Sequence, residues 1–95
     1  MKGYVVCVYK NITNEEKLKE YAIKARVAVE KYNGIFLIRG GRSTSNEGEK
    51  SPRTVVIEFS TYDDANNFYK SIEYQHAHSI LQGHADRQHQ IIEGV

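Results

Sequence analysis

The first apolar run of the chain, GYVVCVY at residues 3–9, constrains the fold more than any other segment. Valine and tyrosine dominate it, which is typical of a β-strand. Its alternating positions form two sets, 4, 6 and 8 against 5, 7 and 9, and both sets are apolar. An antiparallel strand with one face in water would alternate apolar and polar residues. We therefore expect this strand to be covered on both faces.

Residues 13–32 have the spacing of one amphipathic helix. Thr13 followed by Glu16 is typical of a capping box at a helix start, and Asn33-Gly34 is typical of a helix end. Most charged side chains fall off the apolar stripe, which indicates a solvated face rather than a binding patch. The stripe itself consists of Leu18, Tyr21, Ala22, Ala25, Ala28, Val29 and Tyr32.

The remaining chain predicts three more strands and a second helix. Residues 35–40 form a second strand, 41–52 a long polar loop and 53–59 a third strand. Thr61 opens the second helix, Gly83 ends it, and Ser71 is a position where it can break and restart. The sequence HQIIEGV, residues 89–95, predicts a short fourth strand. The expected stripe of the second helix is Ala65, Phe68, Tyr69, Ile72, His76, Ser79 and Ile80.

The resulting order, β-α-β-β-α-β, predicts an α+β, ferredoxin-like fold for a single domain over residues 1–95. Right-handed crossovers would place both helices on one face of a four-stranded antiparallel sheet. The other face would stay uncovered although its residues are apolar, and a monomer rarely exposes so large an apolar patch. We therefore expect a homodimer in which two sheets cover each other.

Composition excludes several classes of function. Lys and Arg total 13 and Asp and Glu total 12, so the net charge of +1 offers no basic surface for nucleic acid or an anionic membrane. No segment has the length of a membrane span, and the start is too short and polar for a signal peptide, so we expect a cytoplasmic protein. The single cysteine, Cys7, precludes an internal disulfide and reads as a buried apolar residue.

The four histidines do not predict a metal site. His76 and His78 stand two positions apart on a predicted helix, so their rings point to different faces, and His84 lies beyond the Gly83 stop. No cysteine joins them at a ligand spacing. We expect neither a metal ion nor another cofactor. His76 falls on the apolar stripe, where it is either a satisfied, partly buried histidine or a general base.

Arg39 is the most informative charged residue, because it stands on an apolar strand and shares a face with Ile35 and Leu37 by alternation. A guanidinium there needs an anion, since it cannot lose its proton. One reading is an ion pair at a dimer interface, with Glu58 as the acid inside a strand. The other is a site for a small carboxylate ligand, which the guanidinium fork suits. The glycines at 40 and 41 favour a turn or bulge rather than a phosphate loop.

Seven tyrosines accompany this arginine, and most lie on apolar stripes. Tyrosine can fill a core and direct its hydroxyl into a polar cavity, although the same residues suit a dimer interface. We expect Arg39, Tyr9, Tyr69 and Tyr74 to bind a ligand, with Glu58 or His76 as the proton acceptor.

The segments KGYVV, KYNGIFLIRGGR, PRTVVIEF, SIEYQ and LQG with IIEGV together resemble the family called domain of unknown function 1330. That family belongs to the dimeric α/β-barrel superfamily, and the resemblance covers residues 2–95. It implies a ferredoxin-like protomer whose homodimer brings two sheets face to face. Its matching polar positions here are Arg39, Arg53, Glu58, Tyr69, Tyr74 and Glu93. The chain departs from the pattern at Ile72, where proline is usual, and at Leu81, where arginine is frequent.

Three functions remain open at this point. The first is the binding of a small aromatic or carboxylated molecule in a cavity near Arg39. The second, which the superfamily implies only by analogy of fold, is a cofactor-independent monooxygenase or isomerase. The third is a structural or interaction dimer without catalysis. A cavity reached by Arg39 and a titratable partner would separate the first two from the third.

Overall fold

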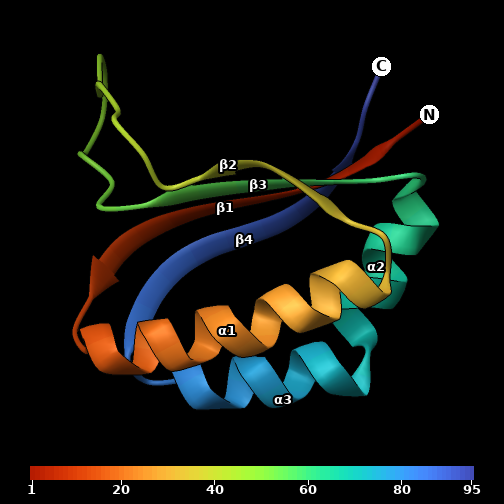
Figure 1. Cartoon of the computed structure of the whole chain (residues 1–95). Coiled ribbons are helices and arrows are strands. Elements are labelled where there is room, and N and C mark those ends of the chain that lie inside the picture. The colour runs from red at the N-terminus through yellow and green to blue at the C-terminus, as the bar shows by residue number, and fades with distance from the viewer.

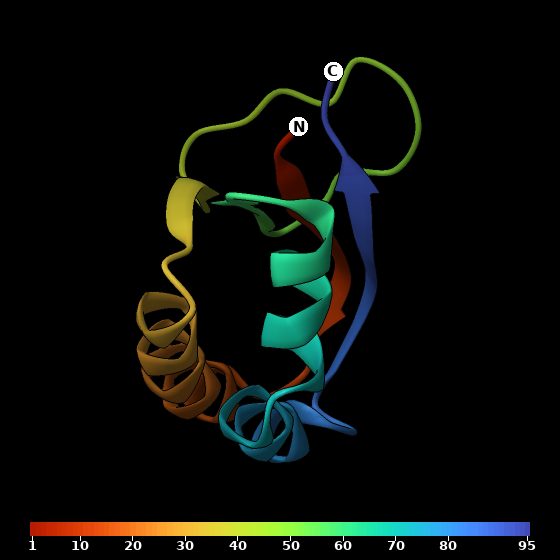
Figure 2. The same cartoon turned by 90° about the vertical axis from the view of Figure 1, so that its right-hand side faces the viewer.

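A computed structural model describes every residue from Met1 to Val95. Its elements are β1 (Gly3–Ile12), α1 (Glu15–Lys31), β2 (Ile35–Arg39), β3 (Thr54–Phe59), α2 (Tyr62–Lys70), α3 (Ile72–Leu81) and β4 (Ala85–Glu93). The strands form one antiparallel sheet in the order β2-β3-β1-β4. All three helices lie on one side of the sheet, with α1 and α3 side by side (Figures 1 and 2). The predicted ferredoxin-like order is confirmed, with three helices instead of two.

The hydrophobic core lies between the sheet and the helices. Every second residue of β1 and of β3 is buried beneath the helices, which is the period of a strand with one covered face. Ala28, Ala65 and Ala77 have no exposed surface, so these small side chains allow the helices to approach closely. The largest fully buried side chains are Tyr9, Tyr74, Phe59, Phe68, Val5 and Val29.

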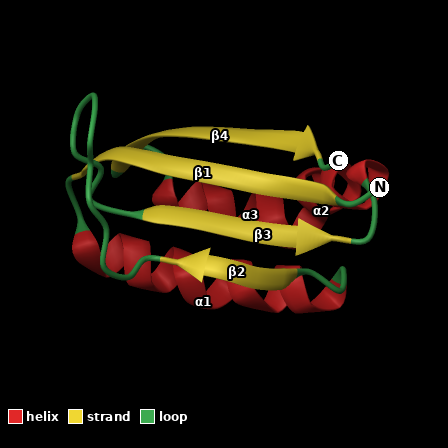
Figure 3. Cartoon of the chain, turned by 90° about the horizontal axis from the view of Figure 1, so that it is seen from above, coloured by secondary structure: helices red, strands yellow, loops and turns green.

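The opposite face of the sheet is covered by nothing within the chain, as Figure 3 shows from above. Tyr4, Val6 and Val8 of β1 point to it and are half-buried by their neighbours on the sheet. Leu37 and Ile92 are 51% exposed. We call this surface the uncovered face. Its apolar side chains agree with the sequence pattern that predicted two covered faces for β1.

The start of α1 differs from the prediction by one residue. Asn14, and not Thr13, is the N-cap, because its side-chain oxygen accepts a hydrogen bond from the backbone N–H of Lys17 at 3.0 Å. The Thr13 hydroxyl donates instead to the backbone carbonyl of His84 at 3.0 Å, and its backbone N–H donates to the same oxygen at 2.9 Å. This long-range contact joins the β1–α1 turn to the start of β4.

The second helix breaks at Ser71, as the sequence allowed. Ser71 is extended (φ −62°, ψ 151°), and its hydroxyl oxygen accepts from the backbone N–H of Tyr74 at 3.0 Å to cap α3. The break resets the helical phase, so Tyr74, Ala77 and Leu81 are the buried residues of α3. The predicted stripe is therefore wrong at Ile72, His76 and Ser79, whereas Ile80 packs partly buried against the core. Ile72 is 86% exposed and His76 is also exposed.

The last strand is longer than predicted. β4 runs from Ala85 to Glu93, whereas HQIIEGV starts only at residue 89. The additional residues pair with the far end of β1, with a register shift between Tyr9 and Asn11. This extension places Arg87 in the sheet, directly opposite Tyr9. None of the helices has both the length and the apolar character that crossing a membrane requires.

Candidate functional site

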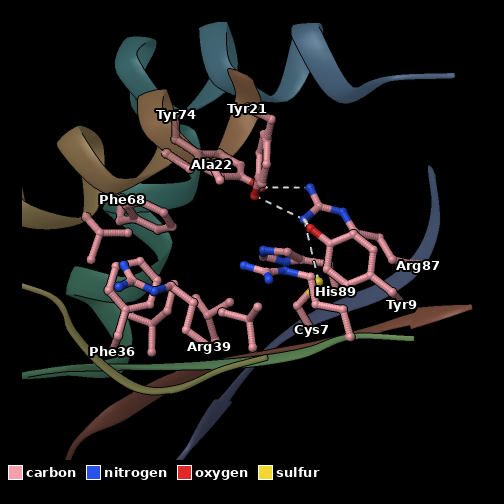
Figure 4. A pocket seen from close by; sticks show the side chains of 16 residues that line it. Cys7, Tyr9, Tyr21, Ala22, Phe36, Arg39, Phe68, Tyr74, Arg87 and His89 are labelled. Atoms are coloured by element: carbon pink, nitrogen blue, oxygen red, sulfur yellow. Dashed lines mark hydrogen bonds between the residues drawn. The ribbon is translucent and has the colours of Figure 1, made fainter. Parts of the chain in front are cut away.

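A cavity of about 40 Å³ lies between the sheet and the three helices. Side chains from all four strands line it, together with Tyr21 of α1, Phe68 of α2 and Tyr74 of α3 (Figure 4). Most lining residues are apolar, and the charged ones are Arg39, Arg53 and Arg87. No Asp or Glu lines the cavity. The cavity therefore concentrates positive charge without an internal counter-ion.

Strand pairing places three polar side chains of the site next to one another. Tyr9 of β1 pairs with Arg87 of β4, and the backbone N–H of Tyr9 donates to the carbonyl of Arg53 at 2.9 Å. Arg53, Tyr9 and Arg87 therefore lie side by side across three neighbouring chain segments. The guanidinium carbons of Arg53 and Arg87 lie 6.0 Å and 5.4 Å from the centroid of the Tyr9 ring. The Tyr9 ring thus lies close to two fixed cations.

Arg39 reaches the same side of the sheet because β2 is irregular. The pairing of β2 with β3 shifts between Phe36 and Ile38, so Arg39 lies opposite Val55, which is buried beneath the helices. Simple alternation placed Arg39 with Ile35 and Leu37, and that expectation is wrong because the extra residue of the bulge reverses the side. Arg39 instead stacks on the Phe36 ring, with its guanidinium carbon 4.7 Å from the centroid. It remains exposed, at the edge of the cavity.

Arg87 is held by neutral partners. Its Nη1 donates to the hydroxyls of Tyr9 at 3.1 Å and Tyr21 at 3.0 Å, and its Nη2 donates to the hydroxyl of Tyr74 at 2.9 Å. Nη1 also lies 3.5 Å from the Cys7 sulfur. A partly buried guanidinium usually pairs with a carboxylate, because burial of a charge is costly. Here Arg87 joins no ion pair, and its protein partners are the three phenols and the Cys7 sulfur.

The three phenols stay protonated at neutral pH. Burial raises the pKa of Tyr9 to about 12, although the charges of Arg87 and Arg53 oppose this shift. Burial likewise raises the pKa values of Tyr21 and Tyr74. Each hydroxyl oxygen accepts from Arg87, so its own proton must point elsewhere. One proton is used between Tyr21 and Tyr74, whose oxygens lie 3.0 Å apart. The Tyr9 proton and one proton of that pair remain available to an acceptor.

Arg53 and Arg39 also have unused donors. No side-chain hydrogen bond or ion pair satisfies either guanidinium, and the Arg53 Nε is buried without a partner. The backbone N–H of Gly40 donates to Thr54 at 2.9 Å, so both arginines stand at the same end of the β2–β3 pair. Gly40 has a φ of 72°, and a Cβ there would lie 3.3 Å from the Arg53 Nη1. Glycine at this position therefore leaves room for the Arg53 side chain.

His89 is the one histidine that lines the cavity. Burial, and then the charges of Arg87 and His78, lower its pKa to about 4, so the imidazole is neutral at physiological pH. Its ring lies 6.0 Å from that of Tyr74 and 5.1 Å from that of Tyr69. The Cys7 thiol is also neutral, since burial raises its pKa against the opposing effect of Arg87. The cavity therefore contains fixed cations and neutral donors, without a nucleophilic thiolate.

The structure brings together Arg39, Tyr9 and Tyr74 of the residues selected from sequence. Tyr69 lies on a second, more polar hollow of about 350 Å³, which adjoins the cavity because Arg87 and His89 line both. Glu58 lies on the uncovered face, where it pairs with the Lys2 ammonium at 3.1 Å and accepts from the Tyr4 hydroxyl at 3.4 Å.

Neither Glu58 nor His76 lines the cavity. Glu58 alternates with Ile57 and Phe59, whose side chains are buried on the helix side, so it points the other way. His76 is exposed on α3 because of the phase change at Ser71. Neither residue is placed to exchange a proton with a ligand beside Arg39.

Sequence reasoning missed Arg87, Tyr21 and His89 as site residues. The alternation of Ala85, Arg87, His89 and Ile91 continues the covered face of β4 toward its start, and this signal could have identified Arg87. Arg53 was noted only as a matching polar position. Its burial depends on Gly40 and on the path of the loop, which no local pattern reveals.

Solved structures with similar folds include three informative neighbours. A protein of unknown function from Rhodopseudomonas palustris has a TM-score of 0.81 at 11% identity, covering 99% of this chain and 82% of the other. A dimeric ferredoxin-like protein of unknown function from a Jannaschia species has a TM-score of 0.79 at 12% identity, over 99% and 100%. A putative antibiotic biosynthesis monooxygenase from Nitrosomonas europaea has a TM-score of 0.62 at 14% identity, over 100% and 99%. At these identities the likeness concerns the fold alone.

A search of curated proteins found no match. The model of one protein family, described as a domain of unknown function (DUF1330), matches residues 2–95. This match covers nearly the whole chain and agrees with the ferredoxin-like order of its elements. The chain therefore belongs to the DUF1330 family, for which no specific function is established.

Proposed function

We propose that this protein binds a small carboxylated molecule in the cavity between its sheet and helices. The observation that carries the proposal is the set of three arginines, Arg39, Arg53 and Arg87, around one cavity that no Asp or Glu lines. Outside the cavity, several exposed cations pair with acids, as in Lys2–Glu58 and Arg26–Glu30. A bound carboxylate would supply the missing charge and acceptors, and guanidinium groups bind carboxylates in a bidentate manner.

The size of the cavity limits what can enter without movement. A volume of about 40 Å³ exceeds the space that one water molecule needs, and suits a carboxylate group rather than a large ligand. Arg39 is exposed at the edge, so its side chain can swing outward to admit a carbon skeleton. The apolar lining and the Phe36 ring suit such a skeleton, whether aliphatic or aromatic.

Titration with butanoate tests this proposal, monitored by ¹H–¹⁵N spectra that include the arginine Nε–H signals. We expect saturable shifts of the Arg87 Nε–H, and none with the neutral analogue butanamide. Arg87→Met should abolish binding, whereas the matched variant Arg26→Met, which removes an exposed cation of α1, should bind like the wild type. Equal responses to butanoate and butanamide, or unchanged binding by Arg87→Met, would refute the proposal.

We also propose that the protein is a homodimer whose two uncovered faces pack together. Exposed apolar residues on that face, such as Leu37 and Ile92, support it, and a structural neighbour is itself described as dimeric. Val6 lies at the centre of this face, opposite Val56 and Gln90. Val6→Lys should give a monomer in light scattering. Ile23→Lys, at an exposed position of α1, should leave the mass unchanged. A monomeric wild type at micromolar concentration would exclude the dimer.

Catalysis is the second candidate, because His89 places a neutral imidazole in the cavity beside the phenol donors. Such a site could transfer a proton to or from a bound ligand, as a cofactor-independent isomerase or monooxygenase requires. Exchange of ligand C–H protons for deuterium, followed by NMR, tests this role. We expect exchange with the wild type and none with His89→Phe. No exchange of any bound carboxylate by the wild type would favour binding alone.

A further inference from the structure

We propose that the ligand is a short dicarboxylate, bound with one carboxylate between Arg53 and Arg39 and the other against the phenols in front of Arg87. This inference rests on the proposed carboxylate binding and specifies its ligand class. It follows from the division of the unused donors into two sets, one at Arg53 and Arg39 and the other at the phenols around Arg87.

The first set belongs to the cluster around Arg87. Its Nη atoms already donate to Tyr9, Tyr21 and Tyr74, which fixes these three hydroxyl oxygens. The protons left over are the Tyr9 proton and one from the Tyr21–Tyr74 pair. Both belong to groups that the Arg87 charge polarises. A carboxylate here would accept two phenol hydrogen bonds and would lie close to a guanidinium without displacing any existing contact.

The second set belongs to Arg53 and Arg39. The Arg53 Nε is buried and unpartnered, and a buried donor without an acceptor is costly. The Nη1 of Arg53 lies close to Gly40, which limits its movement in that direction. Arg39 stands on the neighbouring strand at the same end of the sheet and has no acid partner. A second carboxylate at this end would accept a hydrogen bond from the unpartnered Arg53 Nε and neutralise the charges of Arg53 and Arg39.

The strand order separates the two sets. Arg53 and Arg87 flank β1, so their backbones stand about 10 Å apart at the usual spacing of neighbouring strands. Both side chains line the cavity, and both guanidinium groups lie near the ring of Tyr9 on β1. A monocarboxylate can serve one set and leaves the other without acceptors. A short diacid supplies a carboxylate to each, and its two charges better match three guanidinium groups.

The test compares succinate, butanoate and succinamate, which share a four-carbon skeleton and differ in the group at one end. Affinities are measured by NMR titration at constant ionic strength. We expect succinate to bind the wild type at least tenfold more tightly than either monoanion, since one charge-assisted hydrogen bond corresponds to about a tenfold or larger change. Arg53→Met should reduce the affinity for succinate to that for butanoate and leave the affinity for butanoate almost unchanged. Arg53→Lys keeps the charge but loses the guanidinium fork, so its affinity for succinate should lie between those of the wild type and Arg53→Met.

The outcomes separate this inference from the proposed function. If butanoate and succinate bind the wild type equally, the diacid inference is wrong while carboxylate binding stands. If neither binds, the proposed function itself fails. If Arg53→Met is unfolded by circular dichroism, Arg53→Lys decides: an unchanged succinate-to-butanoate ratio in that variant would overturn the role of the Arg53 fork. Arg26→Met serves as the control for the loss of one positive charge.

Discussion

Removal of the buried imidazole of His89 should change how the stability of the protein depends on pH. Folding lowers the pKa of His89 from 6.5 to about 4 because the side chain is buried, and because Arg87 and His78 lie nearby. Between these pH values His89 is protonated in the unfolded chain and neutral in the folded chain. The free energy of unfolding must therefore decrease as the pH falls from 6.5 to 4, and it must not change on this account above 6.5.

The magnitude follows from the size of the shift. Each pKa unit corresponds to about 1.4 kcal/mol, so His89 should cost the native state about 3 kcal/mol at pH 4 relative to pH 7. His78 and Glu73 also have lowered pKa values and add to the decrease in the wild type. The comparison therefore requires His89→Phe, which keeps an aromatic ring against Tyr69 and Tyr74 but cannot titrate.

The assay is urea denaturation at fixed protein concentration from pH 4 to pH 8. We expect the stability of the wild type relative to His89→Phe to fall by about 3 kcal/mol as the pH is lowered from 8 to 4. His76→Gln, a substitution at an exposed position of α3, should follow the wild type. A difference between wild type and His89→Phe that is independent of pH would show that His89 is not held neutral, and would refute the description of the cavity as cationic and desolvated.

Two further predictions concern residues that shape the site. Ser71→Ala should destabilise the protein by about 1–2 kcal/mol in urea denaturation, because it removes the α3 cap and a buried hydroxyl that donates to the carbonyl of Phe68. The control Ser79→Ala, at an exposed position of α3, should change the stability by less than about 0.5 kcal/mol. Gly40→Ala and Gly48→Ala should each cost about 1 kcal/mol, since both positions have positive φ. Only Gly40→Ala should weaken succinate binding, because its Cβ meets Arg53, and equal succinate binding by the two variants would contradict that contact.

Local patterns predicted most of the fold. The alternation in β1 and β3 indicated strands, and it also showed that the face away from the helices is apolar. Thr61 and Ser71 marked helix starts correctly because their hydroxyls cap α2 and α3 within the same turn. The cap of α1 was misplaced because the hydroxyl of Thr13 is engaged with His84, a contact between residues far apart in sequence that no local pattern contains.

The site was less accessible from the sequence for the same reason. Arg39 lines the cavity, yet its side of the sheet depends on the register shift in β2, which only the pairing with β3 reveals. The apolar pattern of the last strand starts only at residue 89 and so does not include Arg87, whose partners come from β1, α1 and α3. Glu58 and His76 were chosen for their chemistry, but strand alternation and the break at Ser71 direct them away from the cavity.

A crystal structure of the wild-type protein grown in the presence of succinate would show directly whether the arginines of the cavity bind a ligand. We expect a bound diacid in the cavity, with one carboxylate at Arg53 and Arg39 and the other at the hydroxyls of Tyr9 and Tyr74. A cavity that holds only water, with the Arg39 and Arg53 guanidinium groups paired to acids of a second subunit, would contradict it. That result would assign the arginines to the assembly of the protein rather than to a ligand.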